Sequence, residues 1–100
     1  MIERQVSFAE SAHSADAIQR AAYRFSDRLA LDLKRMNGEF VCTLLIDEEL
    51  QDRVDEIAAD FRTEVLDQVL RERIRNETED VRNLILALAF SNTGLTEASE

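Results

Sequence analysis

The sequence contains no proline or tryptophan, and only two glycines and one cysteine among its 100 residues. With 45% hydrophobic and 33% charged residues, this composition excludes collagen-like, low-complexity and disordered classes and is typical of a folded domain. The lone Cys42 excludes an intramolecular disulfide. No apolar run approaches the roughly 18 residues of a membrane span, and no leader-like segment indicates export. We therefore expect a soluble cytoplasmic protein without a membrane partner.

Side chains that carry chemistry are equally scarce. The chain has one histidine, His13, and its carboxylates are spread along predicted helices, so a converging set of metal ligands is not indicated. Gly38 and Gly94 are the only glycines, which excludes a glycine-rich phosphate loop. Cys42 alternates with apolar neighbours, which favours a core position over a thiolate paired with His13. We expect no catalytic residues, no metal and no cofactor.

The charge is distributed unevenly. The net charge is −9, with six acids and six bases in residues 1–46 but fifteen acids and six bases in residues 47–100. Negative charge repels a phosphate backbone, and the arginines of residues 71–75 alternate with other residues instead of forming a basic stripe. Nucleic acid is therefore not an expected partner. The acidic second half would favour encounter with a basic or histidine-rich peptide.

A hairpin is predicted around Asn37-Gly38, because a two-residue turn of this composition between apolar runs suits the positive φ angles of a type I′ turn. This turn fixes the register of the two strands, and alternation places the paired residues on one face. The turn places Met36 opposite Glu39, and the predicted pairs on that face are Leu33 with Cys42, Leu31 with Leu44, and Leu29 with Ile46.

Residues before the hairpin predict a strand and a helix. Residues 4–9 alternate in polarity as a half-buried strand does. Ser14 is a suitable N-cap for a helix whose apolar stripe runs through Ala21 and Phe25 to Leu29, about four turns in length. The chain therefore begins with a strand, a helix and two further strands.

A long helix is predicted to begin near Asp47, where acidic residues favour the positive end of the helix dipole. Its apolar stripe recurs at steps of three and four and continues to residue 74 and beyond. Either one helix reaches about Ser91, or two helices are separated near Asn76. Asn76 and Glu79 could form a capping box at the start of a second helix, and we favour two helices. The stripe includes Leu50, Val54, Ile57, Phe61, Val65, Leu66, Leu70 and Ile74.

These elements predict an α+β two-layer sandwich in the order β-α-β-β-α(-α), with both helices on the apolar face of a three-stranded sheet. The predicted domain covers residues 1–91, and residues 92–100 form a disordered tail. The order of the strands within the sheet is left open.

Three exposed residues are candidates for partner binding. At about 100° per residue, Tyr23 lies roughly 140° from Ile18 and away from the predicted core; an exposed aromatic can bind a partner, although it could equally lie across Arg20 as a boundary residue. Arg71 and Glu72 lie among charges at ion-pair spacing, so a solvated helix face is the alternative. An enzyme would need Glu72 paired with Arg71 or Tyr23 in a cleft.

Two blocks carry a family resemblance. Residues 21–28 read AAYRFSDR, and residues 67–72 contain the pattern Asp-x-x-Leu-Arg-Glu. From about Val6 to Phe90, the chain resembles HxsD of the His-Xaa-Ser system. The resemblance implies a small protein encoded beside two radical S-adenosylmethionine maturases and a precursor protein with His-Xaa-Ser repeats.

Because the cluster of a radical enzyme needs several cysteines, the resemblance together with the lone cysteine implies a non-catalytic accessory protein. Such a protein would bind the precursor or the maturases, for example through an added strand at a sheet edge. The alternative is a structural homo-oligomer formed by the long helix. The residues that would pair in that oligomer are Val69, Leu84, Leu86 or Leu88.

Overall fold

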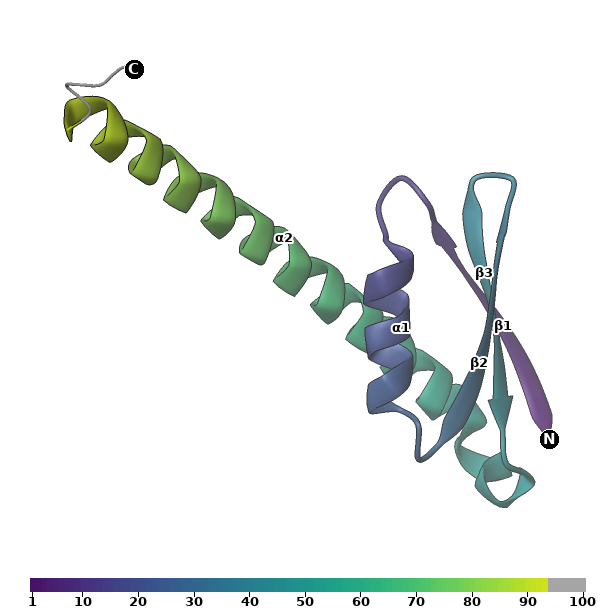
Figure 1. The fold of residues 1–100 in the computed structure, drawn as a ribbon. Helices are drawn as coiled ribbons and strands as arrows, with labels where there is room; N and C mark the ends of the chain where they lie inside the picture. Colours follow the sequence, from purple (N-terminus) through teal and green to yellow (C-terminus); the bar gives the residue numbers. More distant parts are fainter. Residues whose placement is uncertain (94–100) are drawn as a thin grey trace. The chain divides into compact units, whose positions relative to one another are not determined.

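The computed structural model describes the backbone of residues 1–93 and the side chains of residues 1–79. The chain divides into two compact units, Met1–Leu70 and Arg71–Glu100. The predicted α+β order is confirmed (Figure 1). The elements are β1 (Ile2–Ala9), α1 (Ala15–Arg24), β2 (Leu29–Met36), β3 (Glu39–Ile46), the short 3-10 helix η1 (Glu48–Arg53) and α2 (Val54–Thr93).

The sheet has the strand order β1-β3-β2, and both pairs are antiparallel. Asn37 and Gly38 have φ angles of 51° and 79°, as the predicted turn requires. The predicted register is confirmed, with Met36 opposite Glu39 and Leu29 opposite Ile46. The structure also settles the strand order, because β1 pairs with β3 along its whole length. The middle strand of the sheet is therefore the last strand in the sequence.

Helix α1 begins as predicted but is shorter. The Ala17 N–H donates to Ser14 Oγ at 3.0 Å, so Ser14 is the N-cap. The helix ends at Arg24, and the N–H groups of Arg28 and Leu29 both donate to the Phe25 carbonyl oxygen, at 2.8 and 2.9 Å. The prediction of four turns was wrong because Leu29 is already the first residue of β2, paired with β3.

The core of the first unit lies between one face of the sheet and the two helices. Phe61 of α2 is fully buried and contacts Phe25 edge-on, with ring centroids 5.8 Å apart. The even-numbered residues of β1 and β3 face the same core, as strand alternation requires. The buried apolar residues are Val6, Phe8, Ala17, Ile18, Ala21, Phe25, Leu29, Phe40, Cys42, Leu44, Ile46, Val54, Ile57, Phe61, Val65 and Val69.

Helix α2 follows directly on η1. The Glu49 N–H donates to Asp47 Oδ1 at 2.8 Å, so Asp47 caps the helical segment where the acidic cluster predicted its start. From Val54 to Thr93 the helix is continuous, and the favoured break near Asn76 was wrong. Neither proline nor glycine interrupts this stretch, and an asparagine inside a helix costs only a few tenths of a kcal/mol. The rest of the predicted tail, residues 94–100, lies outside the described residues.

The apolar residues of α2 lie on two sides of the helix, one buried and one exposed, although a single buried stripe was predicted. Leu66 and Leu70 are 56% and 45% exposed, and Ile74 is 61% exposed. The core side continues instead through Val65 and Val69, both buried. Because each residue turns the helix by about 100°, Leu66 lies on a different side from Val65. The assignment of Leu66, Leu70 and Ile74 to the core stripe was therefore wrong. Among the described helices, none has the length and apolar content needed to cross a bilayer.

Candidate functional site

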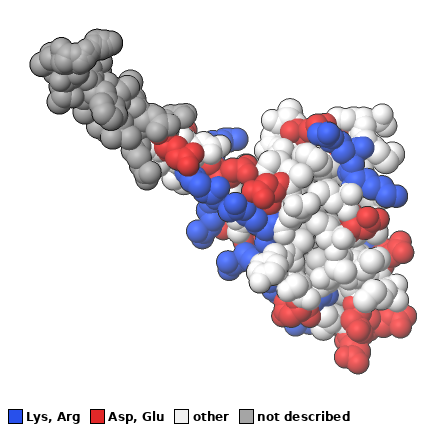
Figure 2. Space-filling model, in the orientation of Figure 1, with Lys and Arg blue, Asp and Glu red and all other residues white. Residues whose placement is uncertain are grey.

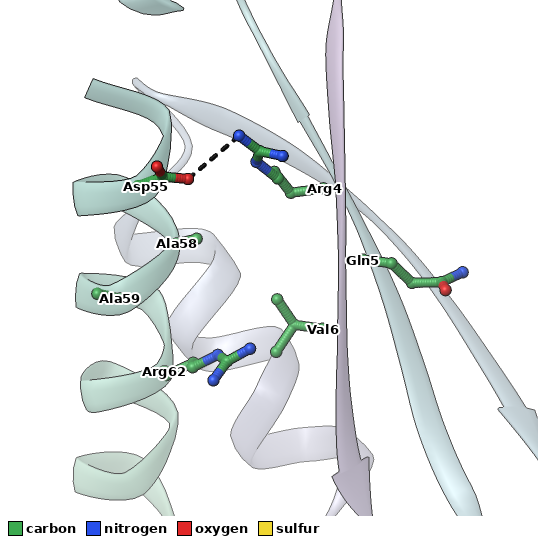
Figure 3. A pocket seen from close by; sticks show the side chains of 7 residues that line it. All are labelled: Arg4, Gln5, Val6, Asp55, Ala58, Ala59 and Arg62. Carbon is green, nitrogen blue, oxygen red and sulfur yellow. Dashed lines mark ion pairs between the residues drawn. The ribbon is translucent and has the colours of Figure 1, made fainter. Parts of the chain in front are cut away.

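A groove lies between β1 and α2 within the first unit (Figure 3). Its volume is about 320 Å³. Figure 3 shows the side chains of Arg4 and Val6 directed toward α2, whereas Gln5 points away from the helix. We refer to this feature as the β1–α2 groove. The residues that line it are Arg4, Gln5, Val6, Asp55, Ala58, Ala59 and Arg62.

The strand that borders this groove has an open outer edge, because β1 pairs only with β3 in the described sheet. The Glu10 N–H donates to the Gly38 carbonyl oxygen at 2.9 Å, and this pair continues the β1–β3 register. In an antiparallel ladder, hydrogen-bonded pairs alternate with non-bonded pairs. Even-numbered residues of β1 therefore bond to β3. The backbone groups of Glu3, Gln5 and Ser7 face the outer edge.

The charges of the β1–α2 groove are two arginines and one aspartate. Arg4 Nη2 lies 3.1 Å from Asp55 Oδ1, with the two side chains 49% and 92% exposed. Arg62 makes no ion pair with any of the residues the structure describes. The groove is also lined by Ala58 and Ala59, whose side chains are single methyl groups. The groove is therefore locally positive with a small apolar wall, although the chain as a whole is acidic.

A second hollow of about 310 Å³ lies between the end of α1 and α2. Its arginines are already engaged: Arg24 Nε lies 3.2 Å from Glu64 Oε2, and the Arg28 guanidinium lies 4.1 Å from the centre of the Phe25 ring. Gln68 Nε2 also donates to Glu64 at 2.8 Å. The Arg24–Glu64 ion pair joins α1 to α2, so this hollow is better explained by packing of the two helices than by ligand binding.

The predicted partner-binding residues fall in both units. Tyr23 of α1 is 81% exposed in the first unit, as its position on the polar side of the helix indicates. Arg71 is exposed and Glu72 half-buried, both in the second unit, and each has an interaction partner. A role for these three residues in partner binding stays a prediction.

The two residues considered for nucleophilic chemistry have structural surroundings. Cys42 has no exposed surface, and burial raises the pKa of its thiol to about 11, so the thiolate is scarce at neutral pH. His13 Nδ1 lies 2.9 Å from the Ala9 carbonyl oxygen, and its ring lies 5.0 Å from that of Phe8. The predicted core position of Cys42 is confirmed. Among the described residues, no three histidine, cysteine or carboxylate side chains gather as a metal site would require.

Acidic and basic side chains are mixed on the face shown in Figure 2. Within the first unit, the acidic side chains of residues 47–70 therefore do not form one continuous acidic surface on that face. Sequence reasoning did not find the β1–α2 groove, because Arg4 and Arg62 come from segments with no shared motif. Only the strand order, which brings β1 to an edge, makes them neighbours of one groove.

Comparison with protein families identifies a match. The family model for HxsD, described as His-Xaa-Ser system protein HxsD, matches residues 8–96. No curated protein and no solved structure matches the chain. The matched segment includes Tyr23, Arg71 and Glu72 and begins after Arg4.

Proposed function

The chain belongs to the His-Xaa-Ser system protein HxsD family, and from this premise we propose that it is a non-catalytic accessory protein of a radical S-adenosylmethionine peptide-modification system. In this role it binds the precursor protein with His-Xaa-Ser repeats or the maturase enzymes. The single cysteine of the chain supports the non-catalytic part, because an iron–sulfur cluster is held by several cysteine thiolates.

The observation that carries this proposal is the open outer edge of β1 beside the β1–α2 groove. Unpaired backbone groups on an edge strand readily pair with another chain, and many peptide-binding domains use such an edge together with an adjacent helix or pocket. The arrangement suits recognition of an extended protein segment better than chemistry on a small molecule.

Tyr23, Arg71 and Glu72 are proposed as further contacts with the partner. Tyr23 supports this role most directly, since an aromatic ring that is 81% exposed is available for burial in an interface. We expect Tyr23→Ala to weaken partner binding without lowering the melting temperature by more than a few degrees. A variant that melts much earlier while its partner affinity stays unchanged would remove Tyr23 from the site.

The proposal is tested by isothermal titration calorimetry of the full chain with the purified precursor protein. Co-purification with each maturase from cells that produce both proteins provides the second readout. The expected result is saturable heat or stoichiometric co-purification with at least one of them. No heat with the precursor and no co-purification with either maturase would reject the proposal.

A structural homo-oligomer is the second candidate, and the exposed aliphatic side chains of Leu66 and Leu70 on α2 favour it. Val69, which the sequence suggested for this contact, lies in the core instead. The side chains of Leu84, Leu86 and Leu88 lie outside the described residues. Light scattering over a range of concentrations tests this candidate, and a strict monomer at high concentration would remove it.

A further inference from the structure

We propose that the β1–α2 groove takes an extended acidic segment of a partner protein as a fourth strand on β1, with a carboxylate of that segment bound by Arg62. This inference rests on the proposed accessory function and specifies the site and the chemistry of the bound segment. It also runs against the net charge of −9, which by itself would favour a basic partner.

Strand addition follows from the direction of the backbone groups. Glu3, Gln5 and Ser7 turn their N–H and C=O groups to the outer edge of β1, where no described strand pairs with them. A new strand would lie about 4.8 Å from β1 and would therefore run along α2. The methyl groups of Ala58 and Ala59 leave space on that side of the groove. A peptide backbone can pair there without displacement of a core side chain.

The charge of the segment follows from the two arginines. Arg62 has no ion-pair partner among the residues whose side chains are described, and the partner of Arg4, Asp55, is 92% exposed. A carboxylate brought into the groove would balance its two positive charges and single negative charge. Guanidinium groups bind carboxylates through two parallel hydrogen bonds. Because charges separated by more than about 8 Å of salt solution are largely screened, the local charge outweighs the net charge.

The alternation of a strand defines the form of the segment. Every second residue of the added strand faces α2, and the intervening residues face the other side. We therefore expect small apolar residues over the alanines and an acidic residue near Arg62, two positions apart. A compact helix could not satisfy the backbone groups of β1 in this way.

The test uses fluorescein-labelled peptides as probes and the full chain as receptor. Three peptides have the 8-residue length of β1 and carry threonine at every second position. At the positions between, which share one face, valine alternates with glutamate, with glutamine or with lysine. Fluorescence anisotropy at about 0.15 M salt, where the Debye length is about 8 Å, is expected to show the tightest binding for the glutamate peptide. Equal binding of all three peptides, or the tightest binding of the lysine peptide, would overturn the inference, as would no binding of any.

Arg62→Glu is expected to weaken binding of the glutamate peptide about tenfold or more, because a charge-assisted hydrogen bond is lost and repulsion is added. The matched control is Arg73→Glu, which makes the same charge change at an exposed residue of α2 outside the groove. If the two variants bind the peptide equally, Arg62 is not the recognising group.

Ser7→Pro tests the strand edge, because proline removes an outward N–H and is tolerated only on edges. Its control is Arg35→Pro on β2, where the same alternation turns the backbone N–H to the opposite outer edge. Loss of peptide binding in Ser7→Pro alone, with both variants folded by circular dichroism, is expected. Equal loss or equal retention in both would overturn strand addition at β1.

Two outcomes separate this inference from the proposed function. If the precursor or a maturase binds wild-type protein and Arg62→Glu with the same affinity, this inference fails and the accessory role stands. If light scattering shows a dimer that Ser7→Pro dissociates, the edge of β1 pairs with a second copy and the inference is overturned. Failure of all partners to bind wild-type protein would end the accessory role itself.

Discussion

Two sides of α2 in the first unit carry similar residues and have opposite surroundings. Ile57, Phe61 and Val65 have no exposed surface, whereas Leu66 and Leu70 expose about half of theirs. The difference arises because three strands and a short α1 cover only one side of the helix. Apolar spacing alone therefore does not define the core. It shows which sides of a helix can be buried, and the area of the sheet and helix packed against them decides which side becomes buried.

The largest expected effect comes from the buried side. Phe61→Ala should lower the free energy of unfolding by about 3–5 kcal/mol, because Phe61 fills the core and contacts Phe8 and Phe25. Urea denaturation followed by circular dichroism measures the change. A decrease in the free energy of unfolding below about 1 kcal/mol would mean that the two sides of α2 do not differ in burial in solution.

Burial on the core side also predicts a dependence on alkaline pH. The pKa of Cys42 is raised to about 11 from an ordinary value of 9.0, so between these values the unfolded chain loses a proton that the folded chain retains. Unfolding is then favoured as pH rises, and stability falls by about 2 kcal/mol over this range. Urea denaturation at pH 8 and pH 11 should show this loss in wild-type protein and a smaller loss in Cys42→Ala.

Gln68 lies at the boundary of the buried side and is 8% exposed. Its amide donates to the Glu64 carboxylate at 2.8 Å, so Gln68→Ala should destabilise the fold by about 1–2 kcal/mol. Gln51→Ala at an exposed position of η1 is the control and should change little. Equal melting curves for the two variants would show that this hydrogen bond contributes nothing measurable.

The smallest effect is expected on the exposed side. Leu66→Gln should change the free energy of unfolding by no more than about 1 kcal/mol, because about half of the leucine side chain is already in water and glutamine is a similar helix former. Thermal melting at two protein concentrations provides the measurement. A large and concentration-dependent loss would instead indicate that Leu66 is buried against a second copy.

Features set by neighbouring residues were predictable from the sequence. The Asn37-Gly38 turn requires positive φ at two positions, and this local demand fixed the whole register of β2 and β3. The helix cap at Ser14 depends on a contact with a residue only three positions away, and it was equally predictable from the sequence. The exposure of Tyr23 followed from its angle on one short helix.

Features set by distant residues were not predictable. Nothing in the sequence of β1 states which strand it joins, and the β1–α2 groove exists only because β1 joins β3 at an edge. The residues around Asn76 fit a capping box and also fit a continuous helix, and the intrinsic helix propensities involved differ by only a few tenths of a kcal/mol per residue. Leu66 and Leu70 matched the helical period and still lie outside the core.

The strand order has a consequence for how the sheet assembles during synthesis. β1 leaves the ribosome before β2 and β3, yet its only neighbour in the described sheet is β3. The β2–β3 hairpin closes through a two-residue turn and can form quickly on its own, whereas β1 must be joined to β3 across the intervening α1 and β2. Until residues 39–46 have been made, β1 has no strand to pair with, and Val6 and Phe8 have no sheet partner to pack beside.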